Sequence, residues 1–419
     1  MLSTLREAGM ELCSEPSESD VVVINTCGFI ESAKAEAIEN ILEMAELKKE
    51  GKIKGIVVSG CLSERYREEL QSELPEIDAV IGVGTMDRIV EAVRAAAGAE
   101  KFSAFDCPER GGLGGKRILT TPPYSAYLKI SDGCNNRCSY CAIPAIRGAL
   151  RSRPLPELLE EAKWLAEHGV SELTLVAQDT TRYGEDLYGE PRLAPLLREL
   201  CKIEGLHWIR VLYCYADRLT DELIEVFATE EKLCKYIDMP VQHLSDRILK
   251  LMNRRDTKAE IVALVKKLRE RIPDITLRTT LIVGFPGETT EDFNELSEGV
   301  KLLKFDRLGV FCYSPEEGTP AAQMSGAVSE RTKERRSEVI MEEQYAIVEQ
   351  KNARMVGQEI EVLCEGYDRI AECSFGRSRA DAPEVDGKVF FTGGRPAEGE
   401  YVTVRVSSAV DYDLFGELV

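Results

Sequence analysis

Three closely spaced cysteines, Cys134, Cys138 and Cys141, are the residues of this sequence best suited to chemistry. They lie in the segment SDGCNNRCSYCAIP, four and three residues apart, directly after a predicted strand at 126–130. Cysteines this close on one loop can hold three irons of a four-iron, four-sulfur cube and leave the fourth iron free for a ligand. The spacing therefore predicts a 4Fe-4S cluster with one open iron.

A structural zinc site is the main alternative for the triplet. Tetrahedral zinc needs a fourth protein ligand, and no histidine or further cysteine lies nearby at finger-like spacing. Accidental core cysteines are a weaker alternative. The iron-sulfur interpretation is favoured over both.

Other residues at the ends of predicted strands are candidates for holding a small ligand. Gln178 and His243 follow predicted strands, Tyr213 ends one, Arg278 lies on one, and Gly284 opens a Gly-Phe-Pro-Gly turn. Three of them have an ordinary alternative: an ion pair for Arg278, a simple turn for Gly284, and a buried, hydrogen-bonded role for His243. The sequence identifies no catalytic side chain among them.

A second pair of cysteines closes two apolar runs near the N-terminus. Cys27 ends VVVINTC and Cys61 ends IVVSGC. If both runs are neighbouring parallel strands, the thiols project from the carboxyl edge of the sheet, where ligands gather. Taken alone, such cysteines are more often buried residues than ligands.

The elements that must position these residues alternate between strands and helices, which is typical of an α/β fold. Strands are predicted at 21–25 and 56–59, with a helix at 32–49 between them, and residues 107–123 are rich in glycine and proline. From residue 124 a strand-helix alternation indicates a partial (β/α)6 barrel. Its six predicted strands are 126–130, 172–177, 208–213, 236–239, 276–283 and 308–312.

The C-terminal part differs from the rest. A charged helix at 329–355 is predicted as a solvated connector, and short alternating runs from 358 to 419 indicate a small antiparallel β-barrel. The predicted domains are 1–105, a linker at 106–123, a barrel with its connector at 124–350, and the small barrel at 351–419.

Composition limits the environment and the partners. The net charge is −20, which argues against nonspecific attraction to a phosphate backbone and favours a basic partner. No apolar run is long enough for a membrane span, and no signal peptide is recognisable, so a cytoplasmic protein without membrane contact is expected. The 13 cysteines form no paired framework and suggest buried thiols or metal ligands.

The C-x3-C-x2-C pattern, with Tyr140 before the last cysteine, resembles the radical S-adenosylmethionine (SAM) superfamily. The resemblance implies that the open iron binds SAM and that the cluster cleaves it to a 5′-deoxyadenosyl radical. In this interpretation Gln178, Arg278 and Gly284 are candidate SAM contacts.

Across nearly the whole chain the sequence resembles the methylthiotransferases, on the segments NTCGFIESAKAE, VVSGCL and GCNNRCSYCAIPAIRG and the β-rich tail. The resemblance implies a second, auxiliary 4Fe-4S cluster with Cys27 and Cys61 among its ligands, and a TRAM domain in the tail that contacts substrate. Family members begin with a strand and a Gly-Cys loop that supplies the third auxiliary ligand. This sequence opens at MLSTLREAG, which matches the following helix, so a truncated or misassigned start is expected. Cys13, in the strand-like stretch MELC, is not at the matching position.

Within that family the segments AIPAIRG and GRSRADAPEVDGKVFF resemble the RimO type, which methylthiolates the β-carbon of an aspartate in the S12 protein of the small ribosomal subunit. Residues 352–419 contain seven basic and 13 acidic residues, a balance that suits a basic protein substrate better than a nucleic acid. A flavodoxin-like or ferredoxin-like electron donor is implied. The alternatives are a tRNA adenosine methylthiotransferase of the MiaB type and a truncated binding protein without turnover.

Overall fold

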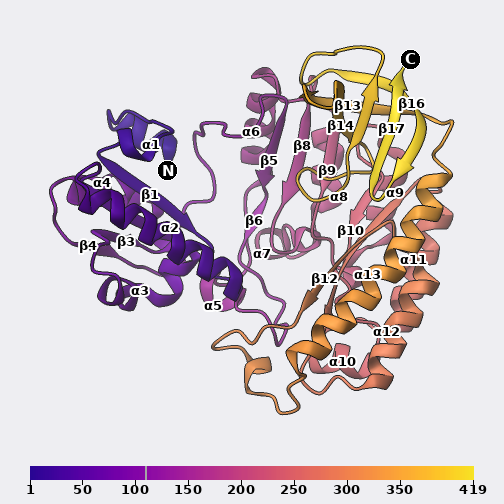
Figure 1. Ribbon diagram of the computed structural model, residues 1–419, viewed down its shortest axis with the longest axis horizontal. Helices are drawn as coiled ribbons and strands as arrows, with labels where there is room; N and C mark the ends of the chain where they lie inside the picture. The colour runs from indigo at the N-terminus through magenta and orange to yellow at the C-terminus, as the bar shows by residue number, and fades with distance from the viewer. Residues whose placement is uncertain (109–110) are drawn as a thin grey trace. The chain divides into compact units, whose positions relative to one another are not determined.

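The computed structural model describes residues 1–108 and 111–419 and divides into two compact units (Figure 1). The N-terminal unit contains Met1–Thr120, Asp132–Arg151 and Ser314–Gln323. The barrel unit contains Thr121–Ser131, Ser152–Tyr313 and Met324–Val419. The expected linker at 106–123 includes residues 109 and 110, which lie outside the described residues.

The N-terminal unit is built on a four-stranded parallel sheet in the order β1-β2-β3-β4. Helices pack against the apolar residues on both faces of this sheet, which confirms the α/β prediction. The strands and the helix expected between residues 21 and 59 are also present. The strands are β1 (Val21–Thr26), β2 (Gly55–Gly60), β3 (Ala79–Ile81) and β4 (Phe102–Ala104), and the helices are α1 (Leu2–Glu7), α2 (Glu31–Lys49), α3 (Cys61–Glu73) and α4 (Ile89–Ala97).

The stretch Met10–Cys13 forms no strand, so that expectation is wrong. After α1 the chain turns at Gly9, whose φ is +83°, and the Met10 N–H donates to the Leu5 carbonyl. Met10 and Leu12 pack against the core on one side of the sheet without joining its ladder. Their apolar character therefore reflects burial and not strand pairing.

Two segments from the predicted barrel region belong to the N-terminal unit. The first carries the cysteine triplet and α5 (Ile143–Arg147), which contacts α3. The second, Ser314–Gln323, is held by the buried Glu316 carboxylate, which lies 2.9 Å from Arg65 and 3.3 Å from Lys34. Short strands β6 (Ser131–Asp132) and β7 (Arg151–Ser152) pair at the base of the cysteine loop.

The barrel unit contains the six predicted parallel strands, in two sheets joined by a parallel bridge between Ile209 and Leu233. Residues Leu173, Leu175, Ile209 and Val211 are fully buried on the helix-covered face. The strands are β5 (Ser125–Lys129), β8 (Glu172–Val176), β9 (Trp208–Val211), β10 (Tyr236–Asp238), β11 (Thr276–Val283) and β12 (Arg307–Cys312). The helices are α6 (Leu155–Glu167), α7 (Glu185–Tyr188), α8 (Leu193–Cys201), α9 (Asp221–Thr229), α10 (Asp246–Leu251), α11 (Lys258–Arg271) and α12 (Thr290–Leu303).

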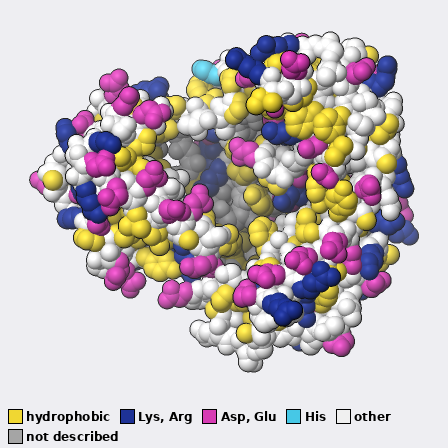
Figure 2. Space-filling view, viewed as in Figure 1, with side chains coloured by type: hydrophobic (Ala, Val, Ile, Leu, Met, Phe, Trp, Pro, Cys, Tyr) yellow, Lys and Arg dark blue, Asp and Glu magenta, His cyan; other side chains and the backbone are white. Residues whose placement is uncertain are grey.

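The connector helix α13 (Glu330–Ala353) is less solvated than its charge predicts. It packs against α12 and β12 and buries Ile340, Gln344 and Val348, because its sparse apolar positions fall on one side. Its other side is charged, and Figure 2 shows acidic and basic side chains interspersed over the face of the molecule that is drawn.

The tail is a closed five-stranded barrel in the order β13-β14-β15-β17-β16. Its pairings are antiparallel except that β15 and β17 run parallel. The strands are β13 (Glu359–Asp368), β14 (Cys373–Ser378), β15 (Val389–Thr392), β16 (Tyr401–Val410) and β17 (Asp413–Leu418). Among the described residues, no helix is both long and apolar enough to cross a membrane.

Candidate functional site

The loop that carries the cysteine triplet is closed at its base by backbone geometry. Gly133 has a φ of +72°, and a Cβ atom there would lie 2.1 Å from the Ala149 carbonyl oxygen. The Cys134 N–H donates to the Gly148 carbonyl, and the Leu150 N–H donates to the Asn135 side chain. Only glycine fits this close approach with a left-handed backbone.

An ion pair also holds together the two ends of the loop that carries the cysteine triplet. The buried Asp132 carboxylate accepts a hydrogen bond from the Gly133 N–H at 3.0 Å and lies 3.2 Å from Nη1 of Arg147. Because Asp132 precedes the triplet and Arg147 follows it, the pair joins the two ends of the loop. Nothing in the cysteine spacing predicts a role for either residue.

The three thiols of the triplet are poorly solvated and lie close enough to affect one another. Cys134 and Cys138 are buried and Cys141 is half-buried. Burial raises the pKa of the Cys141 thiol to about 12, and neighbouring Cys138 and Cys134 contribute to the increase. Metal ligation requires the thiolate form, so iron binding must offset the free energy of deprotonating these buried thiols. The donor set of three adjacent thiols fits a 4Fe-4S cluster with one open iron.

Cys27 and Cys61 lie at adjacent strand ends, as the sequence predicts. Thr26 at the end of β1 pairs with Gly60 at the end of β2, and the two cysteines are the next residues. A Cβ atom on Gly28 would lie 2.7 Å from the Leu62 Cα atom, so the segments that follow the two strands approach closely. Cys61 is buried as the first residue of α3, whereas Cys27 is exposed.

Arg147 links the two cysteine groups within the N-terminal unit. Its Nη2 atom lies 3.2 Å from Sγ of Cys61, and Cys61 packs against Ala142, the residue after the triplet, and Ile146 on α5. Within residues 1–108 and 111–419, no three cysteine, histidine or acidic side chains are already assembled as a metal site. Cys27 and Cys61 follow adjacent strand ends and supply two thiols, fewer than a 4Fe-4S cluster takes.

The predicted SAM contacts lie in the barrel unit, and each has a defined environment. The Oε1 atom of Gln178 is buried and has no hydrogen-bond partner. Arg278 is ion-paired, with Nη1 2.8 Å from Oδ1 of Asp238. Gly284 has a φ of +72°, and a Cβ atom there would lie 2.3 Å from the Lys333 side chain. Packing against α13 is thus sufficient to explain this glycine, and its contact with SAM stays a prediction.

His243 is fully buried, and its Nδ1 atom accepts a hydrogen bond from the Ser245 N–H at 2.9 Å. Burial lowers the pKa of the imidazole to about 3. The side chain is therefore neutral at physiological pH, which favours the interpretation as a buried, hydrogen-bonded residue.

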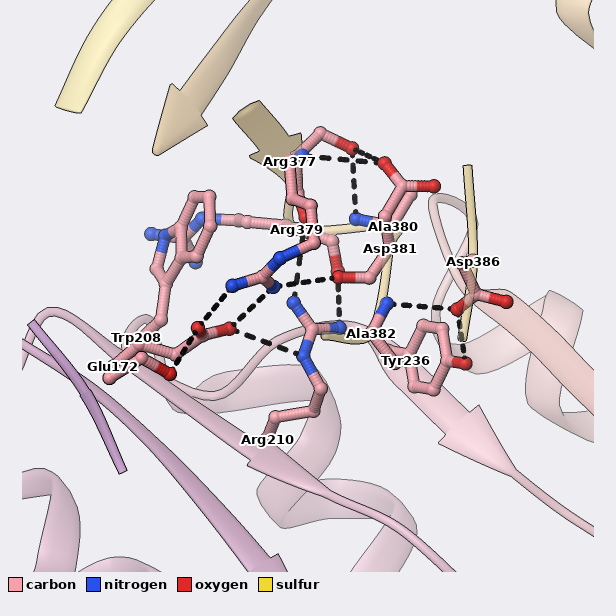
Figure 3. Close-up of polar contacts among 12 residues, drawn as sticks. Glu172, Trp208, Arg210, Tyr236, Arg377, Arg379, Ala380, Asp381, Ala382 and Asp386 are labelled. Carbon is pink, nitrogen blue, oxygen red and sulfur yellow. Dashed lines mark hydrogen bonds and ion pairs between the residues drawn. The ribbon is translucent and has the colours of Figure 1, made fainter. Parts of the chain in front are cut away.

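The small C-terminal barrel is joined to the amino ends of the barrel strands by a buried polar network (Figure 3). Arg377 lies 2.6 Å from Glu172, the first residue of β8, and Nη1 of Arg210 donates to the Arg379 carbonyl. Tyr236, the first residue of β10, donates its hydroxyl hydrogen to Asp386 at 2.6 Å. Arg278, one of the predicted SAM contacts, also borders this network, with its Nε atom 3.8 Å from Oδ1 of Asp386.

A parallel barrel, a cysteine triplet and a small β-barrel together define a radical SAM enzyme with a TRAM domain. Family models agree: residues 128–298 match the Radical SAM superfamily, residues 1–82 match Uncharacterized protein family UPF0004, and residues 356–419 match the TRAM domain. The fold is shared with the radical S-adenosylmethionine methyltransferase TsrM from Kitasatospora setae, with a TM-score of 0.54 and 17% identity over 73% of this chain and 66% of that chain.

Two curated relatives are similar over nearly their whole length. The ribosomal protein uS12 methylthiotransferase RimO of Geobacter sulfurreducens is 48% identical over 100% of this chain and 94% of its own. The RimO protein of Pelotomaculum thermopropionicum is 50% identical over 100% of this chain and 95% of its own. The chain therefore belongs to the RimO family of radical SAM methylthiotransferases.

Proposed function

We propose that this chain methylthiolates the β-carbon of an aspartate in ribosomal protein uS12. The observation that carries the proposal is the near full-length similarity to RimO proteins, together with the cysteine triplet in its closed loop. The β-hydrogen of an aspartate is not acidic enough for a side-chain base, so radical chemistry is required. No general base is needed, which agrees with the lowered pKa of the buried His243, about 3, because a group with that pKa is a weak base.

Cys134, Cys138 and Cys141 would hold a 4Fe-4S cluster. That cluster, when bound, supplies the electron that cleaves SAM to methionine and a 5′-deoxyadenosyl radical. Asp132 and Arg147 keep the ends of the ligand loop together, and burial of the thiols excludes water. We further propose Gln178, Arg278 and Gly284 as SAM contacts, because all three lie on or directly after barrel strands.

We propose Cys27 and Cys61 as ligands of an auxiliary cluster, on the basis of their adjacent strand ends. Two thiols do not complete such a site. No step of the reaction is therefore derived through that cluster.

The proposed partners follow from the same assignment. The substrate is a small-subunit ribosomal protein, and the electron donor is a flavodoxin-like or ferredoxin-like protein. Such a reaction places the chain with ribosomes in the cytoplasm. The acidic balance of the chain supports a basic protein substrate over tRNA.

The domain limits 1–105, 124–350 and 351–419 remain the proposed boundaries in sequence.

The test compares the reconstituted chain with a variant in which Cys134, Cys138 and Cys141 are replaced by alanine. Each is given SAM, a reductant and either a uS12 segment or tRNA. We expect 5′-deoxyadenosine and a methylthio mass gain on the uS12 segment with the parent chain, and neither product with the variant. Modification of tRNA alone would contradict the proposal, as would unchanged SAM cleavage by the variant.

A further inference from the structure

Tyr213 has an unusual backbone conformation for its position. It follows β9 at the carboxyl edge of the barrel sheet and has a φ of +60°. Most other non-glycine residues with positive φ in the described residues follow helices or lie in turns, as do Ala99, Lys304 and Asp411. A bulky residue in the left-handed region is strained, and such strain concentrates at functional sites.

Hydrogen bonds at both the N–H and the carbonyl of Tyr213 hold its backbone in this conformation. Its N–H donates to Oδ2 of Asp238 at 3.1 Å, and its carbonyl accepts hydrogen bonds from the N–H and hydroxyl of Thr180 at 3.1 and 3.0 Å. Asp238 is in turn fixed by Arg278 at 2.8 Å. The surrounding structure thus determines the strained backbone independently of the tyrosine side chain.

The side chain of Tyr213 is 45% exposed, although Leu212 and Cys214 on either side are buried. The Tyr213 N–H binds Asp238, so Tyr213 lies at the same strand ends as the Asp238–Arg278 ion pair. Burial, with a further contribution from Asp238, raises the pKa of the phenol, so it stays protonated at neutral pH and can donate a hydrogen bond. An accessible aromatic ring is therefore presented at the strand ends where barrel enzymes bind substrate.

We propose that Tyr213 contacts the aspartate-bearing segment of the protein substrate, its ring packing against the peptide and its hydroxyl donating a hydrogen bond to it. This inference rests on the proposed function. Hydrogen abstraction from one chosen carbon requires a substrate held in a fixed orientation, and a residue locked by Asp238 and Thr180 provides a rigid contact. A protonated phenol suits a carboxylate-bearing peptide, because it donates without adding charge.

The test uses Tyr213→Gly, Tyr213→Phe and, as a matched control, Tyr345→Ala. Tyr345 lies on α13 and is 43% exposed, which is close to the exposure of Tyr213. Each reconstituted protein is assayed for melting temperature, SAM affinity, binding of a fluorescent uS12 segment, and KM and kcat for methylthiolation.

Glycine tolerates the left-handed backbone, so in Tyr213→Gly the relief of strain offsets part of the cost of losing the ring and of the added chain entropy, and the melting temperature should change little. We expect it to keep the SAM affinity but to weaken uS12 binding and raise KM at least about tenfold, the signature of a lost substrate contact. Tyr213→Phe retains the ring and should show a smaller loss, while Tyr345→Ala should match the parent chain.

Unchanged uS12 binding in Tyr213→Gly, with an active parent chain, would overturn the inference and leave the proposed function intact. A parallel loss of SAM affinity would instead assign Tyr213 to the SAM site and would equally overturn it. If the parent chain neither binds nor modifies uS12, the proposed function fails and the inference fails with it.

Discussion

Arg377 on β14 and Glu172 on β8 form a fully buried ion pair, with Nη2 of the arginine 2.6 Å from Oε2 of the glutamate. Arg210 lies 3.5 Å from the same carboxylate, and its Nη1 atom donates to the Arg379 carbonyl. Burial opposes ionisation of Glu172, but the hydrogen bond and charge of Arg377 outweigh it and lower the pKa of the carboxyl group. The TRAM barrel and the SAM barrel thus share a polar core.

Replacing Arg377 with methionine should destabilise the barrel unit by about 3 kcal/mol, because the buried Glu172 loses its main partner while Arg210 and the Ser125 hydroxyl remain. Urea unfolding can be followed by tryptophan fluorescence, since both tryptophans, Trp164 and Trp208, belong to this unit. The double variant Glu172→Gln, Arg377→Met should recover part of the loss.

Arg405→Met serves as the control. It removes an exposed ion pair with Glu359 on the same TRAM barrel, for which we expect a loss below about 1 kcal/mol. Equal effects of the Arg377 and Arg405 substitutions would show that the buried network does not join the two barrels energetically.

Gly133→Ala should impair iron binding by the cysteine triplet. The new Cβ atom would meet the Ala149 carbonyl oxygen in a left-handed backbone, which costs about 1–3 kcal/mol and opens the base of the loop. Iron content and the visible absorption of the reconstituted protein measure the effect. Gly112→Ala is a matched control in the same unit, because no atom lies within 4 Å of its Cβ position. Full iron loading of Gly133→Ala would disprove the role of this close approach.

The stability of the barrel unit should fall as the pH decreases below about 6.5, the pKa of an unfolded histidine. The pKa of His243 is about 3 in the folded chain because of burial, so only the unfolded state binds a proton between these values. The stabilisation is therefore complete above pH 6.5 and is lost on acidification, by up to about 1.4 kcal/mol per pH unit. Urea midpoints measured from pH 7 to pH 4 should show a shallower dependence for His243→Gln. An identical slope in both proteins would mean that His243 is solvated.

Replacing both Cys27 and Cys61 with alanine should lower methylthiolation, because both proposed ligands of the auxiliary cluster are lost, and should leave the triplet cluster and SAM cleavage intact. The reason is that the triplet holds its own loop together through Asp132 and Gly133, without either of these cysteines. Iron analysis, 5′-deoxyadenosine release and product mass measure the three properties. Cys134→Ala should abolish all three, and normal product formation by the Cys27, Cys61 variant would remove these residues from the reaction.

The sequence by itself determined the local features of this protein. The spacing of Cys134, Cys138 and Cys141 defines one loop. Apolar runs that alternate with helical stretches define the six barrel strands, because such strands are buried on both faces, as β8, β9 and β10 are. The capping box of Thr257 and Glu260 forms at the start of α11, since it involves only residues within one turn. The adjacent positions of Cys27 and Cys61 also follow, from parallel pairing of two apolar strands.

Only the tertiary structure decided which distant groups meet. Arg377 pairs with Glu172, which lies 205 residues away in the sequence. Arg147 contacts Cys61, and nothing in the sequence near Arg147 or near Cys61 predicts that contact. The left-handed backbone of Tyr213 depends on Asp238 and Thr180, which lie on other strand ends. A periodic pattern in the sequence indicates which face of one helix or strand is buried. Which charged side chains form ion pairs depends on how whole helices and strands pack together, and the local sequence does not encode that packing.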